Sequence, residues 1–175
     1  MKEYEFTLKF ILQDASIGPE IFVERLGAEG CDDALVGLGQ NGRIAMTFNR
    51  ESSSAYQAIS SAICDVKHVI PDARLIEATP DLVGLTDVAE LLGFSRQNMR
   101  KLMLGSGGTF PAPLHDGKPA IWHLAKVLGW LKERNKYQID DALLEVSNTN
   151  MQFNIAKEIK EIDPGLQDDI HTLIA

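Results

Sequence analysis

The chain has 175 residues, of which 45% are hydrophobic, and carries a formal net charge of −8. This length allows one large or two small globular domains, and no apolar run approaches the roughly 20 residues that a membrane-spanning helix requires. The amino terminus leads directly into a predicted strand, so we expect no signal peptide and a cytoplasmic location. Cys31 and Cys64 cannot form a disulfide framework, and we expect both to be buried free thiols.

The first 80 residues alternate between strand and helix patterns. Apolar and polar residues alternate over 6–12, as in a half-buried strand, and a helix is expected with Pro19 at its first position and its end at Gly30. The elements predicted next are a strand at 34–38, a turn at 39–42, a strand at 44–48, a helix at 55–70 and a strand at 73–78. This βαββαβ order predicts an α+β fold with a ferredoxin-like domain over residues 1–80, which senses a small-molecule effector or mediates assembly.

Residues 85–104 have the pattern of two helices joined by a tight turn. The small Ala89 falls where the helices would cross, Gly93 where the chain must turn with positive φ, and Ser95 where its hydroxyl can cap the second helix. The apolar residues expected to hold the two helices together are Val88, Leu92, Phe94, Met99 and Leu102. Long hydrogen-bond donors remain on the outer side, namely Arg96, Gln97, Arg100 and Lys101. The alternative, an ordinary helical hairpin with a solvated basic face, leaves the agreement of these features unexplained.

A hairpin and a closing helix are predicted after this pair. Residues 110–122 have two short extended pieces around an Asp116-Gly117 turn, and residues 123–134 have apolar side chains at helical spacing. This order resembles the winged helix-turn-helix domains of the MerR and excisionase-like superfamily. The segments that carry the resemblance, over about residues 84–136, are 85–104, Phe110-Pro-Ala-Pro113 with Gly117 and Trp122, and 127–131.

The resemblance implies a recognition helix at 95–104 that enters the major groove of DNA and a wing at 110–122 that contacts the DNA backbone or minor groove. The DNA-binding residues would then be Ser95, Arg96, Gln97, Arg100 and Lys101 on the helix, and His115 and Lys118 on the wing.

Charge divides the chain in the same way. Residues 84–136 hold eight basic and four acidic side chains, a net charge of +4. Residues 1–83 hold 7 basic and 13 acidic side chains, and residues 137–175 hold 2 and 8, so each flank carries −6. A basic segment between acidic flanks is expected of a DNA-binding module within a larger regulator. Because the acidic flanks oppose non-specific binding, we expect modest affinity that depends on a homodimer.

Residues 137–175 are expected to form a helical tail for dimerisation or partner binding. Apolar spacing predicts a short helix near 139–146, an interruption at 147–150, a helical stripe over 153–162 and a final helix after Pro164. These stripes need a partner surface, which is either the chain's own domains or another subunit. MerR-type regulators dimerise through a helix that follows the DNA-binding domain, and the resemblance therefore favours a homodimer.

The sequence contains no arrangement of residues that indicates catalysis, and we expect neither enzymatic activity nor a cofactor. The neighbouring Asp32 and Asp33 would face opposite ways on a strand. Cys64 and His68 have a spacing that could share a metal on a helix, but a structural zinc site needs further ligands, so no metal is expected. The glycine-rich segments lack the Lys-Ser/Thr of a phosphate-binding loop.

The sequence therefore predicts a sequence-specific DNA-binding transcriptional regulator, expected to be a repressor, that binds double-stranded DNA as a homodimer. One alternative is an antitoxin-like interaction protein whose acidic flanks bind a basic partner protein and whose DNA binding autoregulates its operon. An enzyme built on the N-terminal sheet is a further option, which would require a pocket with convergent polar groups.

Overall fold

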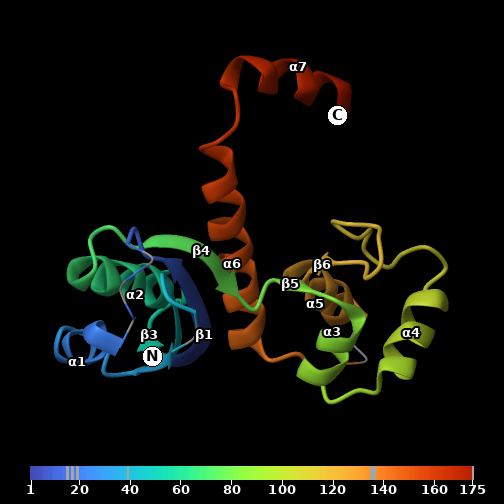
Figure 1. Ribbon diagram of the computed structural model, residues 1–175. Helices are drawn as coiled ribbons and strands as arrows, with labels where there is room; N and C mark the ends of the chain where they lie inside the picture. Colours follow the sequence, from blue (N-terminus) through green and yellow to red (C-terminus); the bar gives the residue numbers. More distant parts are fainter. Residues whose placement is uncertain (15, 17, 19, 39, 135–136, 175) are drawn as a thin grey trace.

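The computed structural model describes residues 1–14, 16, 18, 20–38, 40–134 and 137–174. Over these residues the protein is a mixed α/β structure with seven helices, a four-stranded antiparallel sheet and a pair of two-residue strands (Figure 1). The predictions made on Pro19, Gly39 and Lys136 fall outside the described residues. Within the described part of the chain, no helix combines the length and the apolar character needed to cross a membrane.

The sheet is formed by the first 80 residues. The elements are β1 (Lys2–Ile11), α1 (Glu20–Ala28), β2 (Ala34–Leu38), β3 (Arg43–Ser52), α2 (Ala55–Val69) and β4 (Arg74–Thr79). The strands lie in the order β2-β3-β1-β4, and each neighbouring pair is antiparallel. Alternate residues of β1 are buried beneath the two helices: Tyr4, Phe6, Leu8 and Phe10. The predicted order of strands and helices is therefore present, and the alternating pattern of β1 identifies its buried face.

Arg50 of β3 links the segment that follows α1 to helix α2 through hydrogen bonds. Its Nε donates to Asp33 Oδ2 (2.6 Å), its Nη1 to Asp65 Oδ2 (2.8 Å) and its Nη2 to the Gly30 carbonyl oxygen (2.7 Å). Asp33 and Asp65 each form an ion pair with Arg50. Cys31 is buried beside this group, whereas Cys64 is exposed, so the prediction that both thiols are buried is wrong for Cys64.

The second half of the chain has its own apolar core. Its elements are β5 (Leu82–Val83), α3 (Leu85–Leu91), α4 (Arg96–Leu104), β6 (Trp122–His123) and α5 (Leu124–Glu133). The short strands β5 and β6 pair antiparallel, with Val83 opposite Trp122. The residues of the core include Val88, Met99, Leu124, Val127, Leu128 and Leu131, each fully buried.

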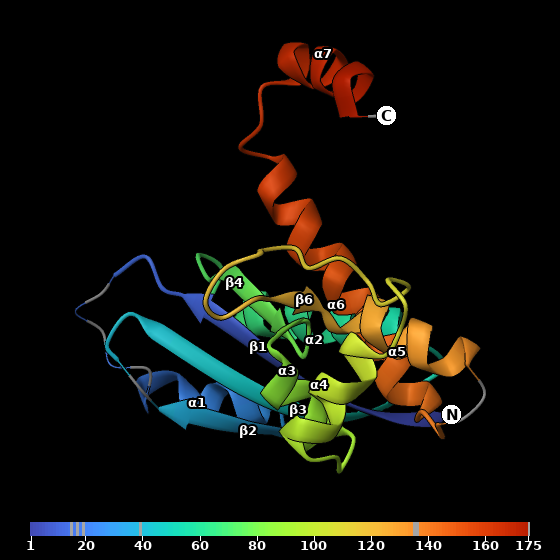
Figure 2. The same cartoon turned by 90° about the vertical axis from the view of Figure 1, so that its right-hand side faces the viewer.

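Helix α6 (Asp141–Ile159) runs between the sheet and this second core, and α7 (Pro164–Ile174) extends from its far end (Figures 1 and 2). Near the start of α6, Glu145 accepts hydrogen bonds from the Tyr4 hydroxyl (2.9 Å) and the Ala55 backbone N–H (2.9 Å). The helix is continuous through Ser147–Asn150, so the predicted interruption is wrong. Polar residues at 147, 150 and 154 are buried instead of breaking the helix.

A buried polar network joins the two halves. The Asn154 side chain accepts from the Ala78 N–H (2.9 Å) and donates to the Ala78 carbonyl oxygen (2.8 Å), which satisfies the outer edge of β4. The same Asn154 Nδ2 donates to Asp81 Oδ2 (2.8 Å), while Asp81 Oδ1 lies 2.8 Å from Nδ1 of His123 at the start of α5. A buried carboxylate is stable only with such partners, and these contacts connect β4, α5 and α6.

Candidate nucleic-acid interface

The two helices α3 and α4 are joined by a turn that the local sequence specifies. Gly93 has φ +67°, a left-handed conformation that glycine adopts without a steric penalty. The Phe94 N–H donates to the Ala89 carbonyl oxygen (2.7 Å), and Ser95 Oγ accepts from the Asn98 N–H (3.1 Å) at the start of α4. Ala89 is buried in the second core. Gly93 and Ser95 have the structural roles that were predicted for them.

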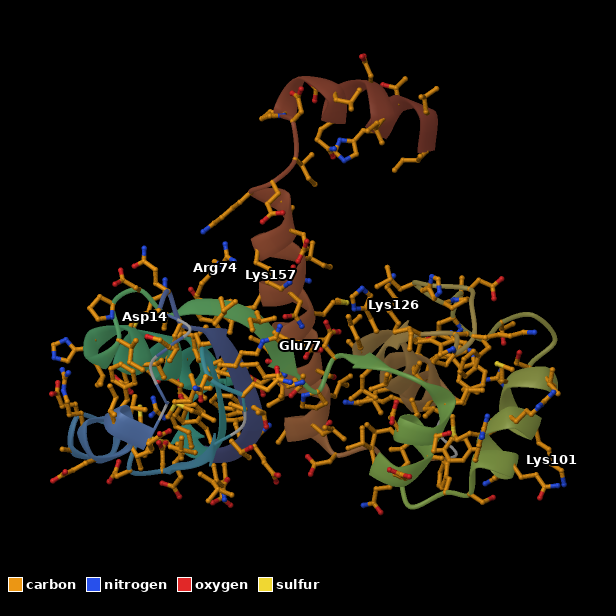
Figure 3. The ribbon with its side chains drawn as sticks, in the orientation of Figure 1. Asp14, Arg74, Glu77, Lys101, Lys126 and Lys157 are labelled. Carbon is orange, nitrogen blue, oxygen red and sulfur yellow. The ribbon has the colours of Figure 1, made fainter. Side chains whose placement is uncertain are left out.

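One side of helix α4 packs into the second core, and the other side is exposed to solvent. Met99 is fully buried and Leu102 is half-buried. The predicted DNA-contacting side chains of α4 are all on the exposed side: Ser95, Arg96, Gln97, Arg100 and Lys101. Lys101 lies at the outer edge of the molecule, far from the sheet (Figure 3). The helix therefore presents long donors to solvent without using its own packing contacts.

The segment predicted to be a hairpin wing has a different structure. Over residues 110–121 its β pairing consists of a single bridge between His115 and Ile121, closed by a hydrogen bond from the Ile121 N–H to the His115 carbonyl oxygen (2.9 Å). Prolines at 111, 113 and 119 lack the N–H that a ladder needs, which explains why two paired strands do not form. The segment is a loop that closes at this bridge, with exposed His115 and Lys118.

Aromatic packing fixes the base of this loop. The Phe110 ring lies edge-on to Trp122 and Trp130, with centroid distances of 6.0 and 5.0 Å. The Trp122 Nε1–H donates to the Pro111 carbonyl oxygen (2.9 Å). The Arg134 guanidinium lies 3.9 Å from the centre of the Trp130 ring. Arg134 is therefore a structural cation, although it counts toward the basic charge of this segment.

The glycine-rich connection at 105–108 is also fixed by hydrogen bonds. Its Ser106 is buried, accepts from the Phe110 N–H through Oγ (3.3 Å) and accepts from the Thr109 hydroxyl through its carbonyl oxygen (2.9 Å). These bonds make the connection a hydrogen-bonded turn that leads into the loop.

A groove of 640 Å³ lies between α4 and this loop. Arg96 and Arg100 of α4 and Lys118 of the loop are among the residues that line it. The acidic Asp87 also lines it and accepts from the Gly84 N–H (2.7 Å), which places its carboxylate at the start of α3. Guanidinium and ammonium groups that converge from two elements can bind an anionic backbone in a fixed register.

The remaining predicted site residues surround this groove without lining it. Ser95, through its cap, sets the start of α4, while Gln97 and Lys101 point to solvent beside the groove. The His115 ring lies over Gly117, where an added Cβ would be 2.1 Å from Nε2. The loop therefore contributes one cation to the groove and one imidazole to the surface.

The described ranges contain no candidate metal-binding cluster. No group of three or more His, Cys, Asp or Glu side chains there could hold a metal ion. His68, considered with Cys64 as a possible ligand, has its Nε2 3.0 Å from Glu29 Oε2. The buried Asp81–His123 pair was missed by the sequence interpretation, because its two residues lie 42 positions apart and the Asn154 amide that also binds Asp81 lies 73 positions from it.

No family model matches the chain, and neither a curated protein nor a solved structure matches it. Its function has to be inferred from the site described above.

Proposed function

We propose that this protein is a sequence-specific DNA-binding transcriptional regulator. In this proposal residues 84–136 are a winged helix-turn-helix domain of the MerR and excisionase-like kind, α4 is the recognition helix and the loop at 110–121 acts as the wing. The first 80 residues are a ferredoxin-like domain, which the strand order β2-β3-β1-β4 with two helices on one face supports.

The observation that carries the proposal is the convergence of cations in one groove. Arg96 and Arg100 on α4 and Lys118 on the loop come from segments that meet only in the folded protein. If the basic side of α4 were only a solvated helix surface, a cation on a second element at the same groove would not be expected. A DNA phosphate backbone passing between helix and wing would meet donors from both sides.

The positions along α4 indicate different roles for its donors. Arg96 and Gln97 occupy the first turn of the helix, which is the part of a recognition helix that contacts base edges. Lys101 lies in the last turn, further from the capped end, where a contact with phosphate is expected. Base contacts would therefore centre on Arg96 and Gln97, and affinity without sequence preference on the other cations.

A single recognition helix contacts too few base pairs to specify a unique site in a genome. We therefore propose that the protein binds DNA as a homodimer. Its operator would be an inverted repeat with half-sites about 34 Å apart or a multiple of that distance. Repression is the expected sign of regulation, in the cytoplasm.

Selection of bound fragments from genomic DNA, followed by footprinting, tests the proposal and yields the site. The variant Arg96→Ala/Arg100→Ala should lose about 2–6 kcal/mol of binding free energy, at about 1–3 kcal/mol per contact. A matched control, Lys2→Ala/Arg25→Ala, removes the same charge from exposed positions of the sheet half and should bind normally. If the groove variant is folded and binds the selected DNA as tightly as the parent, the proposal is wrong.

One observation favours a second candidate, an antitoxin-like protein that binds a partner and autoregulates its operon. The acidic tail exposes large apolar side chains, among them Ile159, Leu166 and Leu173. A partner of opposite charge would cover them. Co-purification of a basic protein with the native chain, lost when α7 is deleted, would support this candidate over simple repression.

A further inference from the structure

Helix α7 has an apolar face that nothing in the described chain covers. Leu166, Ile170, Leu173 and Ile174 recur at the spacing of one helical stripe. Leu166 is 55% exposed, Leu173 84% and Ile174 75%. No residue of the helix is buried, and it projects away from the body of the molecule (Figure 2). A helix of this length is marginal in water without a surface to pack against.

A matching surface exists beside α6. A groove of 800 Å³ lies between the end of α2, the start of β4 and the second half of α6; we call it the tail groove. Apolar side chains in it include Ile63, Leu75 and Phe153, all partly buried. Five cationic residues line it, with Arg43 at the start of β3: Arg43, Lys67, Arg74, Lys157 and Lys160. Its lining also includes the acidic Asp72, Glu158 and Glu161. Figure 3 shows Arg74 and Lys157 on neighbouring elements, β4 and α6.

With five cationic and three acidic residues, the tail groove has a net charge of +2, opposite in sign to that of α7. Within the described residues, Arg43, Lys67, Arg74 and Lys160 form no ion pair, and Lys157 pairs with its neighbour Glu158. Residues 163–174 carry three aspartates and no lysine or arginine. At 100° per residue, Asp169 flanks the apolar face of α7 and Asp168 lies on the opposite side. One acidic group would therefore meet the cations while the apolar face enters the groove.

We propose that α7 of one copy binds the tail groove of a second copy, so that two copies exchange their C-terminal helices. The inference rests on the proposed homodimer and names the surface that forms it. Lys160 and Glu161 line the groove and directly precede α7. Two copies that meet at these ends of α6 therefore bring each α7 next to the other groove. The exchange closes a two-fold dimer in which the same contact occurs twice.

The exchange is tested by complementation on full-length chains. Leu173→Asp disables the tail, and Arg74→Glu/Lys160→Glu disables the groove; each variant alone should be monomeric by light scattering at concentrations where the parent is a dimer. Mixed together, they retain one intact tail and one intact groove, so a heterodimer should form. Thr172→Asp, which adds the same charge on another side of α7, is the matched control and should leave the dimer intact.

The outcomes separate this inference from the proposed function. A Leu173→Asp variant that stays dimeric, or two monomeric variants that do not combine, would overturn the exchange. A parent that is monomeric would also overturn it. Binding of the parent to a DNA duplex that carries a single half-site is measured in parallel. If the parent does not bind this duplex, the proposed DNA binding is wrong, whereas a successful complementation still supports the exchange of α7.

Discussion

Replacing Asn154 by alanine should destabilise the whole molecule, because this side chain joins the edge of the sheet to the buried polar network between the two halves. It makes three hydrogen bonds, two with the Ala78 backbone and one with Asp81. Each buried group left without a partner costs about 1–3 kcal/mol, and more for a charged one. For the three groups that lose their partner the sum is about 3–9 kcal/mol. Because α6 can shift and water can enter, we expect a total in the lower part of that sum, about 3–5 kcal/mol.

Urea denaturation measures this loss with two probes. Trp122 and Trp130 both lie in the second core, so their fluorescence follows that half, and circular dichroism follows the whole chain. With an m-value of about 2 kcal/mol/M, the midpoint should fall by about 2 M in both probes.

The matched control is Asn148→Ala on the exposed side of the same helix, where the helix propensity changes equally. A midpoint for Asn154→Ala equal to that of the control would show that the buried amide does not stabilise the junction. A shift in circular dichroism without a shift in tryptophan fluorescence would show that the two halves unfold independently, which contradicts the role assigned to the network.

Three further predictions concern packing and the thiols. Ala89→Leu should overfill the crossing of α3 and α4 and cost about 1–3 kcal/mol, seen as a lower melting temperature; unchanged melting would mean that space exists there. Gly93→Val should cost about 1–3 kcal/mol through its positive φ, whereas Gly93→Asn, which tolerates that conformation, should melt near the parent, and equal melting of both would contradict the strain argument. Burial raises the pKa of the Cys31 thiol to about 11, so a thiol reagent at pH 8 should modify Cys64 quickly and Cys31 only on unfolding. The folded state then keeps a proton that the unfolded thiol loses near pH ~8.5, so stability should fall between about pH 8.5 and 11 and Cys31→Ala should lessen the fall; an identical pH profile would refute this.

The sequence by itself determined the features that depend on neighbours along the chain. Alternation in β1 identified its buried face. Ala89, Gly93 and Ser95 located a helix pair to within a residue or two, because the steric demand of a turn and the hydrogen bond of a cap involve only a few adjacent residues. The exposed positions of Arg96 and Arg100 followed from the same helical period.

The tertiary structure decided what depends on distant partners. The polar run at 147–150 resembles a break in sequence, yet α6 continues through it, because Asn150 donates to the Pro80 carbonyl oxygen (3.2 Å) and Asn154 to Ala78. The same holds for the groove, where Lys118 and Arg96 line one surface because the aromatic base anchors the loop beside α4. A polar side chain is compatible with burial only when its partner is in place, and that partner can lie 70 residues away in the sequence.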